Sequence, residues 1–174
     1  MSEAVLSESG HRRLRLIGLS VAVLTLLADQ GHKIAMLYGL GFIGMLPGEG
    51  IRVTSFFNLI MVWNPGISYG LLPVSGMGTL ILIAVVMAIV GFLGWWMWNA
   101  TSLAVVLGCG LVIGGGLGNN LVDRLIYGKV ADFFHFHAFG YNWYVFNIAD
   151  VAVVLGAVAF IYDVLKPSES SNDA

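Results

Sequence analysis

The stretch that decides the fold is TLILIAVVMAIVGFLGWWMW, residues 79–98. It carries no charged side chain, and its length matches the roughly 20 apolar residues that a helix needs to cross the hydrocarbon core of a bilayer. The uncharged sequence around it extends from Val53 to Val122, which leaves room for a second span. The sequence therefore predicts an integral membrane protein.

The composition of the whole chain agrees with this interpretation. Of its 174 residues, 58% are hydrophobic and only 10% are charged, whereas a soluble domain averages roughly 25% charged residues. The net charge of −2 provides no basic surface, which argues against nucleic acid as a partner. A single cysteine, Cys109, excludes an internal disulfide. We expect one domain covering residues 1–174.

We predict an all-α membrane protein with four transmembrane helices. Arg12, Arg13 and Arg15 precede the first span, which lacks a cleavage site of small residues and is therefore a retained helix. The total Lys/Arg count is equal for the two orientations, but the three arginines favour both termini in the cytoplasm. The predicted spans cover about residues 14–40, 79–98, 103–122 and 147–165.

A small extracytoplasmic β-like element is expected between the first two helices, in residues 48–73. It contains a β-branched and aromatic run, residues 53–63, followed by the turn Asn64-Pro65-Gly66. An unpaired strand would leave backbone groups without hydrogen-bond partners inside hydrocarbon. We therefore place this segment on the outer surface of the membrane.

On this topology, the polar residues gather at one membrane boundary. Asp29 lies about 15 residues, or ~22 Å, into the first span, and Lys33 follows one turn later on the same helix face, where it can pair with Asp29. The other members are Asn64 in the external turn, Asn119, Asn120, Asp123 and Arg124 where the third span ends, Asp132 in the following loop, and Asn147 and Asp150 where the fourth begins. Ionisable residues at such positions normally mark a functional site.

A purely structural network would account for the aspartates of the first and third spans, which can pair with Lys33 and with Arg124 or another neighbour. It does not account for Asp132 and Asp150, because neither carboxylate has a basic residue dedicated to it. Lys129 lies three residues before Asp132, but its side chain can reach water instead. Two such carboxylates near an apolar boundary should have their pKa values pushed apart. One would then be protonated and one ionised, as in an aspartic peptidase.

Other hydrolytic chemistries are poorly supported by the sequence. The chain has no H-E-x-x-H motif, and its one match to G-x-S-x-G, Gly66-Ile67-Ser68-Tyr69-Gly70, lies in the predicted outer segment and not where a strand meets a helix. His135 and His137 form an H-x-H pair without an obvious third ligand, which is more typical of an interfacial loop than of a metal site. We predict no metal.

Four short motifs occur in order along the chain. They are Asp29-Gln30-Gly31-His32-Lys33 (D-x-x-x-K), Asn64-Pro65-Gly66 (N-x-G), Asn120-Leu121-Val122-Asp123-Arg124 (N-x-x-D-R) continued by Gly128-Lys129-Val130-Ala131-Asp132-Phe133 (G-x-V-x-D-F), and Phe146-Asn147-Ile148-Ala149-Asp150 (F-N-x-A-D). In these motifs the chain resembles lipoprotein signal peptidase, the bacterial type II signal peptidase, a family of intramembrane aspartic peptidases.

The chain departs from the family pattern at one point. The family reads G-N-x-x-D-R, whereas Gly118-Asn119-Asn120 places one extra residue in this motif. The spacing from Asp123 favours Asn120 as the family asparagine, and the adjacency to glycine favours Asn119. Both alternatives stay open at this point.

The resemblance implies Asp132 and Asp150 as the catalytic dyad, with Asp123–Asp150 as the rival pair. It implies no metal and no organic cofactor. The residues expected to bind substrate or support the site are Asp29, Lys33, Asn64, Gly66, Asn119, Asn120, Asp123, Arg124, Asn147 and Ala149.

The implied substrate is a prolipoprotein whose cysteine carries diacylglycerol, cleaved just before that cysteine. We expect a monomer in the bacterial cytoplasmic (inner) membrane, in contact with membrane lipid, with its active site near the outer face. The alternative is a small proton-coupled transporter or channel. That function predicts polar residues across the whole depth of the membrane, but the middle of each predicted span has almost none. A purely structural assembly subunit is a third possibility, but it would not require Asp132 and Asp150 to be unpaired.

Overall fold

Four long helices form the body of the molecule. The computed structural model describes residues 7–66 and 76–166. The helices are α1 (Glu8–Ile34), α2 (Met77–Asn99), α3 (Leu103–Gly116) and α5 (Ile148–Leu165). Together with the turns that extend α1 and α3, all four are long and apolar enough to cross a membrane. The predicted fold class, a four-helix membrane protein with a small antiparallel sheet, is confirmed.

Two of these helices continue as π-helical segments toward the same end of the bundle. The segment η1 (Ala35–Gly39) extends α1, and η4 (Leu117–Asp123) joins α3 to the short helix α4 (Arg124–Tyr127). At its other end α1 begins at Glu8, earlier than the predicted residue 14. Ser7 caps it there, because its side chain accepts a hydrogen bond from the backbone nitrogen of Gly10.

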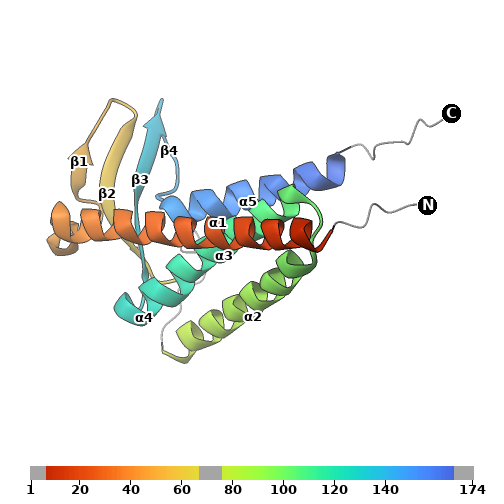
Figure 1. The fold of residues 1–174 in the computed structure, drawn as a ribbon. Helices are drawn as coiled ribbons and strands as arrows, with labels where there is room; N and C mark the ends of the chain where they lie inside the picture. The colour runs from red at the N-terminus through yellow and green to blue at the C-terminus, as the bar shows by residue number, and fades with distance from the viewer. Residues whose placement is uncertain (1–6, 67–75, 167–174) are drawn as a thin grey trace.

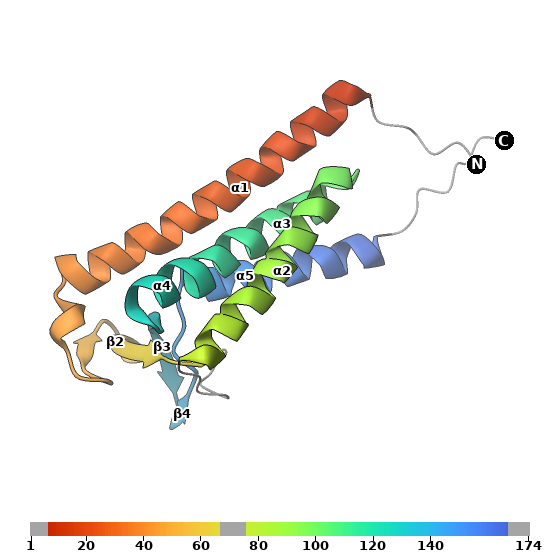
Figure 2. The same ribbon diagram turned by 90° about the horizontal axis from the view of Figure 1, so that it is seen from below.

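Helix α3 lies at the centre of the bundle (Figure 2). In an 18-residue stretch of its span, 61% of the residues are buried inside the protein. In the corresponding stretches of the other three spans, 11–17% of the residues are buried. Glycines allow this position, because a Cβ atom on Gly114 would lie 2.5 Å from the carbonyl oxygen of Ala22 and one on Gly115 would lie 2.7 Å from that of Ala149. Small residues of this kind let membrane helices approach closely.

A four-stranded antiparallel sheet lies at one end of the bundle (Figure 1). Its strands, in spatial order, are β1 (Gly50–Arg52), β2 (Phe57–Asn64), β3 (Val130–Ala138) and β4 (Tyr141–Asn142). The prediction of a loop after the third span is wrong, because Asp132 lies on β3, opposite Val62 of β2. This pairing joins segments far apart in the sequence, which local pattern does not reveal. Residues 67–73 of the predicted outer segment lie outside the described residues.

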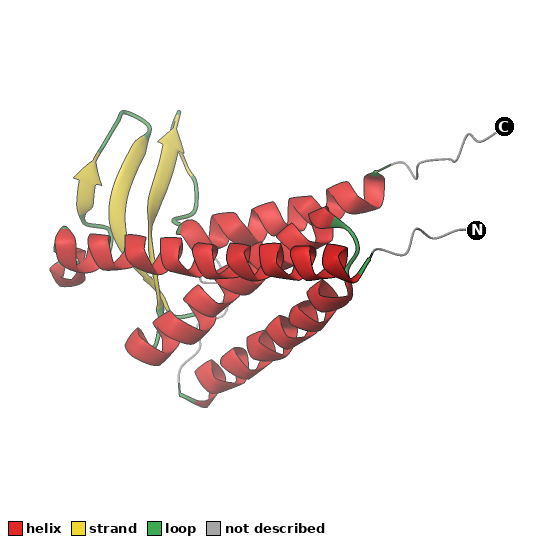
Figure 3. Cartoon of the chain, in the orientation of Figure 1, coloured by secondary structure: helices red, strands yellow, loops and turns green. Residues whose placement is uncertain are grey.

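The sheet crosses the bundle where α1 and α3 end and where α2 and α5 begin (Figure 3). The start of α1 and the finish of α5 lie together at the opposite end. Ala131 and Phe133 of β3 pack with residues that follow α1 and with β2, in a second core formed with Met36, Leu37, Phe42 and Met61. This packing fixes β3 against the helix ends, where the polar residues gather.

Candidate active site

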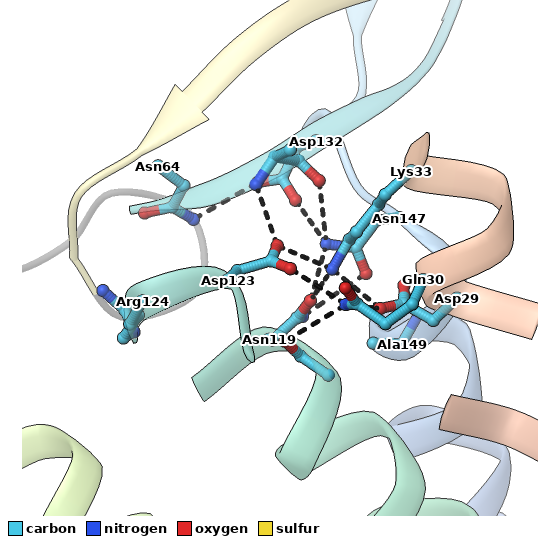
Figure 4. A network of polar contacts seen from close by, with 12 residues as sticks. Asp29, Gln30, Lys33, Asn64, Asn119, Asp123, Arg124, Asp132, Asn147 and Ala149 are labelled. Carbon is cyan, nitrogen blue, oxygen red and sulfur yellow. Dashed lines mark hydrogen bonds and ion pairs between the residues drawn. The ribbon is translucent and has the colours of Figure 1, made fainter. Parts of the chain in front are cut away.

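A buried lysine forms two ion pairs at the junction of helices and sheet (Figure 4). Lys33 Nζ lies 2.8 Å from Asp29 Oδ2 and 2.8 Å from Asp123 Oδ2. The two aspartates are fully buried and the lysine is 1% exposed. Asp29 and Lys33 continue the buried stripe of α1 that includes Ala22 and Thr25, so the helix period itself turns them inward.

The expected pairing of Asp29 with Lys33 is therefore present. For Asp123 the sequence leaves the partner open between Arg124 and a neighbour, and the structure places Lys33 there. A single ammonium shared by two buried carboxylates leaves negative charge that further donors have to stabilise.

Gln30, which the sequence reasoning missed, supplies one such donor. Its Nε2 lies 3.0 Å from Asp29 Oδ2 and 2.9 Å from Asp123 Oδ1. The residue has no sequence signal beyond its position between Asp29 and Lys33. We call Asp29, Gln30, Lys33 and Asp123 the lysine cluster.

Backbone groups from two other elements complete the lysine cluster. The backbone nitrogen of Ala149, at the start of α5, donates to Asp29 Oδ1 at 3.0 Å. The backbone nitrogen of Ala131, on β3, donates to Asp123 Oδ2 at 3.2 Å. Gly118 leaves room for the carboxylate of Asp29, because a Cβ atom on residue 118 would lie 2.6 Å from Asp29 Oδ2.

Two asparagine amides lead from the lysine cluster to the predicted catalytic aspartates. Asn119 Oδ1 accepts a hydrogen bond from Lys33 Nζ at 2.5 Å, and its Nδ2 donates to Asp150 Oδ1 at 3.1 Å. Asn147 caps α5, with its Oδ1 accepting from the backbone nitrogen of Asp150 at 3.0 Å and its Nδ2 donating to Asp132 Oδ1 at 2.6 Å. A cation orients the first amide and a helix N-terminus orients the second, so each presents its N–H groups to a carboxylate.

The structure brings Asp132 and Asp150 to the same cavity, of about 140 Å³. Asn64 also lines this cavity, and its Nδ2 lies 3.4 Å from Asp132 Oδ2. Asp132 is only 3% exposed. Burial, and next the neighbouring Asp150 carboxylate, raise the pKa of Asp132 to about 8.

Arg124 holds the turn that carries Asn64. Its guanidinium donates to the carbonyl oxygen of Pro65 at 3.3 Å and to that of Gly66. The backbone nitrogen of Gly66 in turn donates to Asn64 Oδ1 at 3.0 Å, which leaves the amide nitrogen of Asn64 directed at Asp132. The turn and the cavity are therefore linked through one arginine.

The π-helical segment η4 contains the extra residue of the third motif. A π-helical turn accommodates one more residue than an α-helical turn. The residues before and after η4 can therefore point in the same directions as they would without the extra residue. Asn119 contacts Asp150 and Lys33, whereas Asn120 Oδ1 accepts from Arg124 Nε at 3.2 Å. The two asparagines that the sequence leaves as alternatives thus occupy different places.

His135 and His137 lie on β3 and not in a loop. Their ring centroids are 5.4 Å apart. Within residues 7–66 and 76–166, no three or more His, Cys, Asp or Glu side chains are grouped so that they could hold a metal ion.

The fold and the site together define an integral membrane protein with a buried polar centre at one end of its helices. Comparison with known proteins then identifies the family. A family model described as signal peptidase (SPase) II matches residues 21–166. The chain belongs to this family, lipoprotein signal peptidase, and is a peptidase.

Relatives and solved structures support this membership over nearly the whole chain. The lipoprotein signal peptidase of Rhodopseudomonas palustris (strain TIE-1) is 46% identical over 156 residues, which cover 86% of this chain and 92% of that protein. The one from Methylobacterium radiotolerans is 43% identical and covers 86% of each chain. A solved structure described as a bacterial membrane enzyme, at 26% identity, superposes with a TM-score of 0.75 and covers 91% of this chain and 93% of that one. The transporter or channel alternative finds no support in these matches.

Proposed function

We propose that the protein is an aspartic endopeptidase that removes the signal peptide of diacylglyceryl-modified prolipoproteins, cutting just before the lipidated cysteine. One observation carries the aspartic mechanism. Asp132 and Asp150 line the same cavity, whereas Asp29 and Asp123 are fully buried and engaged by Lys33. Of these two pairs, only Asp132 and Asp150 border a cavity that a substrate and a water molecule can reach.

In the proposed resting state, the dyad Asp132–Asp150 holds one proton. The raised pKa of Asp132, about 8, favours its protonated form at neutral pH. Asp150 lies in the first turn of α5, where the helix dipole stabilises a negative charge. The ionised Asp150 removes a proton from water, whose oxygen attacks the peptide carbonyl carbon while Asp132 donates a hydrogen bond to the carbonyl oxygen. The leaving nitrogen then takes up a proton from the dyad as the C–N bond breaks.

The other site residues hold this arrangement in place. The lysine cluster fixes Asn119, and we assign to Asn119 the family asparagine role because its Nδ2 donates to Asp150. Arg124 and Gly66 fix Asn64 at the cavity wall. Hydrolysis by two carboxylates requires no metal or organic cofactor.

We place the protein in the bacterial cytoplasmic membrane with both termini inside and the cavity near the outer face. Four spans return the chain to its starting side, and Arg12, Arg13 and Arg15 lie at the end of the bundle away from the sheet. Trp95 and Trp98 are exposed near that end, as in an interfacial aromatic belt. Both dyad residues come from one chain, so a monomer surrounded by lipid suffices for activity.

The test uses purified protein and a precursor with and without diacylglyceryl on its cysteine. We expect Asp132→Asn and Asp150→Asn each to lower the rate of cleavage of the lipidated precursor by at least about 10³-fold. Asp163→Asn, on the last turn of α5 and away from the cavity, is the matched control and keeps normal cleavage. Circular dichroism and thermal unfolding verify that each variant is folded.

Normal cleavage by either dyad variant would refute the assignment. The rival pair is tested by Asp123→Asn. Substantial turnover in that variant excludes Asp123–Asp150, whereas loss of turnover in a folded Asp123→Asn protein, together with activity in Asp132→Asn, would establish it. Equal cleavage of the unmodified precursor would refute the proposed substrate class.

A further inference from the structure

The first turns of α1 line a hollow of about 1060 Å³ at the end of the bundle away from the sheet. Figure 2 shows this end, with the first turns of α1 at the edge of the molecule. Arg12, Arg13 and Arg15 line the hollow together with Glu8. These side chains carry a net positive charge. We call this space the α1 hollow.

Within the described part of the chain, two of these arginines have no protein partner. Arg12 and Arg13 are exposed, and among residues 7–66 and 76–166 neither side chain forms an ion pair or a hydrogen bond. Arg15, in contrast, donates from Nε to the carbonyl oxygen of Trp98 at 2.9 Å, and its guanidinium lies 4.5 Å from the centroid of the Trp98 ring. Arg15 is therefore held against α2, whereas the other two guanidinium groups are available to a ligand.

The lining of the α1 hollow changes from charged to apolar along the helix. Leu16 follows Arg12 by one turn, and Ile17 follows Arg13 by one turn, so each pair lies on one helix face. Val21, one turn after Ile17, also lines the hollow. From Arg13 to Val21 the helix rises about 12 Å. The charged groups thus lie at the membrane boundary and the apolar groups lie deeper.

The apolar wall of the hollow is fixed by the contact between α1 and α3. Ile17 packs against the buried core that contains Val106 and Cys109. Val21 lies directly against α3, because a Cβ atom on Gly110 would lie 2.9 Å from Val21 Cβ. The deep part of the hollow is therefore a preformed surface, while the two unpartnered arginines stay exposed at its mouth.

An anionic phospholipid has the same order of chemical groups. Its phosphate oxygens accept hydrogen bonds from guanidinium groups, and its acyl chains follow within about the next 10 Å. Basic pockets beside membrane helices bind headgroups of this kind. A free anion would contact only the arginines and leave the apolar wall uncovered, and a choline headgroup would bring a second cation toward the arginines.

We propose that the α1 hollow binds one phospholipid with an anionic headgroup, with its phosphate at Arg12 and Arg13 and an acyl chain along Ile17 and Val21. The proposal goes beyond the proposed function and does not depend on which aspartates are catalytic. The proposed topology serves only to name the leaflet, which is the cytoplasmic one. The lipid would fasten the start of α1, the helix whose other end carries the lysine cluster.

The test is native mass spectrometry of the full chain in neutral detergent with equimolar phosphatidylglycerol and phosphatidylcholine of identical acyl chains. We expect one phosphatidylglycerol to be retained in preference to phosphatidylcholine. Arg12→Gln and Arg13→Gln should each lower this preference roughly fivefold, and the double variant about 25-fold. Both side chains are exposed, and thermal unfolding verifies that the variants are folded.

The matched control for charge is Arg52→Gln, an exposed arginine on β1 at the other end of the molecule, which should keep the full preference. Ser20→Trp fills the α1 hollow at unchanged charge and should also lower retention of phosphatidylglycerol. Ile89→Trp, at an exposed position of α2, is its control and should retain the lipid.

Three outcomes would overturn the proposal. The first is equal retention of the two lipids by the parent protein. The second is the same loss of preference in Arg52→Gln as in Arg12→Gln, since the lipid would then respond to total charge and not to a site. The third is complete displacement of the lipid by millimolar inorganic phosphate, because the hollow would then recognise a free anion. None of these outcomes affects the dyad test.

Discussion

Replacing Asp132 with asparagine should make the protein more stable at neutral pH while it destroys activity. The pKa of Asp132 is raised from 3.8 to about 8 in the folded protein. The native state therefore holds a proton between about pH 4 and pH 8 that the unfolded chain has lost. Stability from this group is fully present below about pH 4 and falls as the pH rises toward 8.

The magnitude follows from this difference. At pH 7, taking up the proton on folding costs about 4 kcal/mol, and each pH unit between about 4 and 8 changes the cost by about 1.4 kcal/mol. The Asp132→Asn variant has no such cost. Its new amide group, however, would face Asn147 Nδ2 or Asn64 Nδ2 as a second donor, a penalty of about 1–3 kcal/mol. The net gain at pH 7 is therefore about 1–3 kcal/mol.

The assay is thermal unfolding in detergent micelles at pH 5, 6, 7 and 8, followed by tryptophan fluorescence. The gain in unfolding free energy of Asp132→Asn over the parent should grow by about 3 kcal/mol between pH 5 and pH 7, which corresponds to roughly 6–12 °C in Tm. The amide penalty cancels in this comparison because it does not depend on pH. Glu8→Gln, exposed at the far end of α1, is the control. A difference between parent and Asp132→Asn that stays constant with pH would refute a raised pKa at this carboxyl.

Three further changes test other parts of the site. Lys33→Met leaves two buried carboxylates without a cation and should destabilise the protein by about 3–5 kcal/mol; a normal yield of folded protein with unchanged Tm would contradict the ion pairs. Asn147→Ala removes the α5 cap, which costs about 1 kcal/mol of stability, and also the N–H group donated to Asp132. We therefore expect kcat to fall while KM stays near its parent value. Kinetics on the lipidated precursor separate kcat from KM, and a change confined to KM would argue against the orienting role of Asn147. Deleting Asn120 restores the family spacing and should convert η4 to regular α-helix with cleavage within about threefold of the parent; complete loss of activity in a folded protein would mean that the extra residue is not absorbed there.

Much of the architecture can be predicted from the sequence because the membrane imposes simple length and polarity constraints. Apolar runs locate the four helices, and the i, i+4 spacing of Asp29 and Lys33 places them on one buried face. The predicted convergence of polar residues at one end agrees with the arrangement in the structure.

The remaining features depend on contacts between distant segments. The sequence alone predicts a loop where β3 lies, because its partner β2 is far earlier in the chain and the two strands form one sheet only through that pairing. Gln30 gives no signal because its importance comes from Asp123, a neighbour across the helix interface. The choice between Asn119 and Asn120 requires the π-helical geometry of η4, which no local propensity indicates.

The lysine cluster also constrains how the protein is made. Its carboxylates are contributed by α1 and η4, yet two of their hydrogen-bond donors, the backbone nitrogens of Ala131 and Ala149, come from β3 and from the last helix. During synthesis, Asp29 and Lys33 enter the membrane long before these partners exist. A nascent chain is therefore incomplete at its polar centre until α5 is inserted. A chain that stops before residue 148 should leave buried charge incompletely satisfied, and we expect cellular quality control to degrade it.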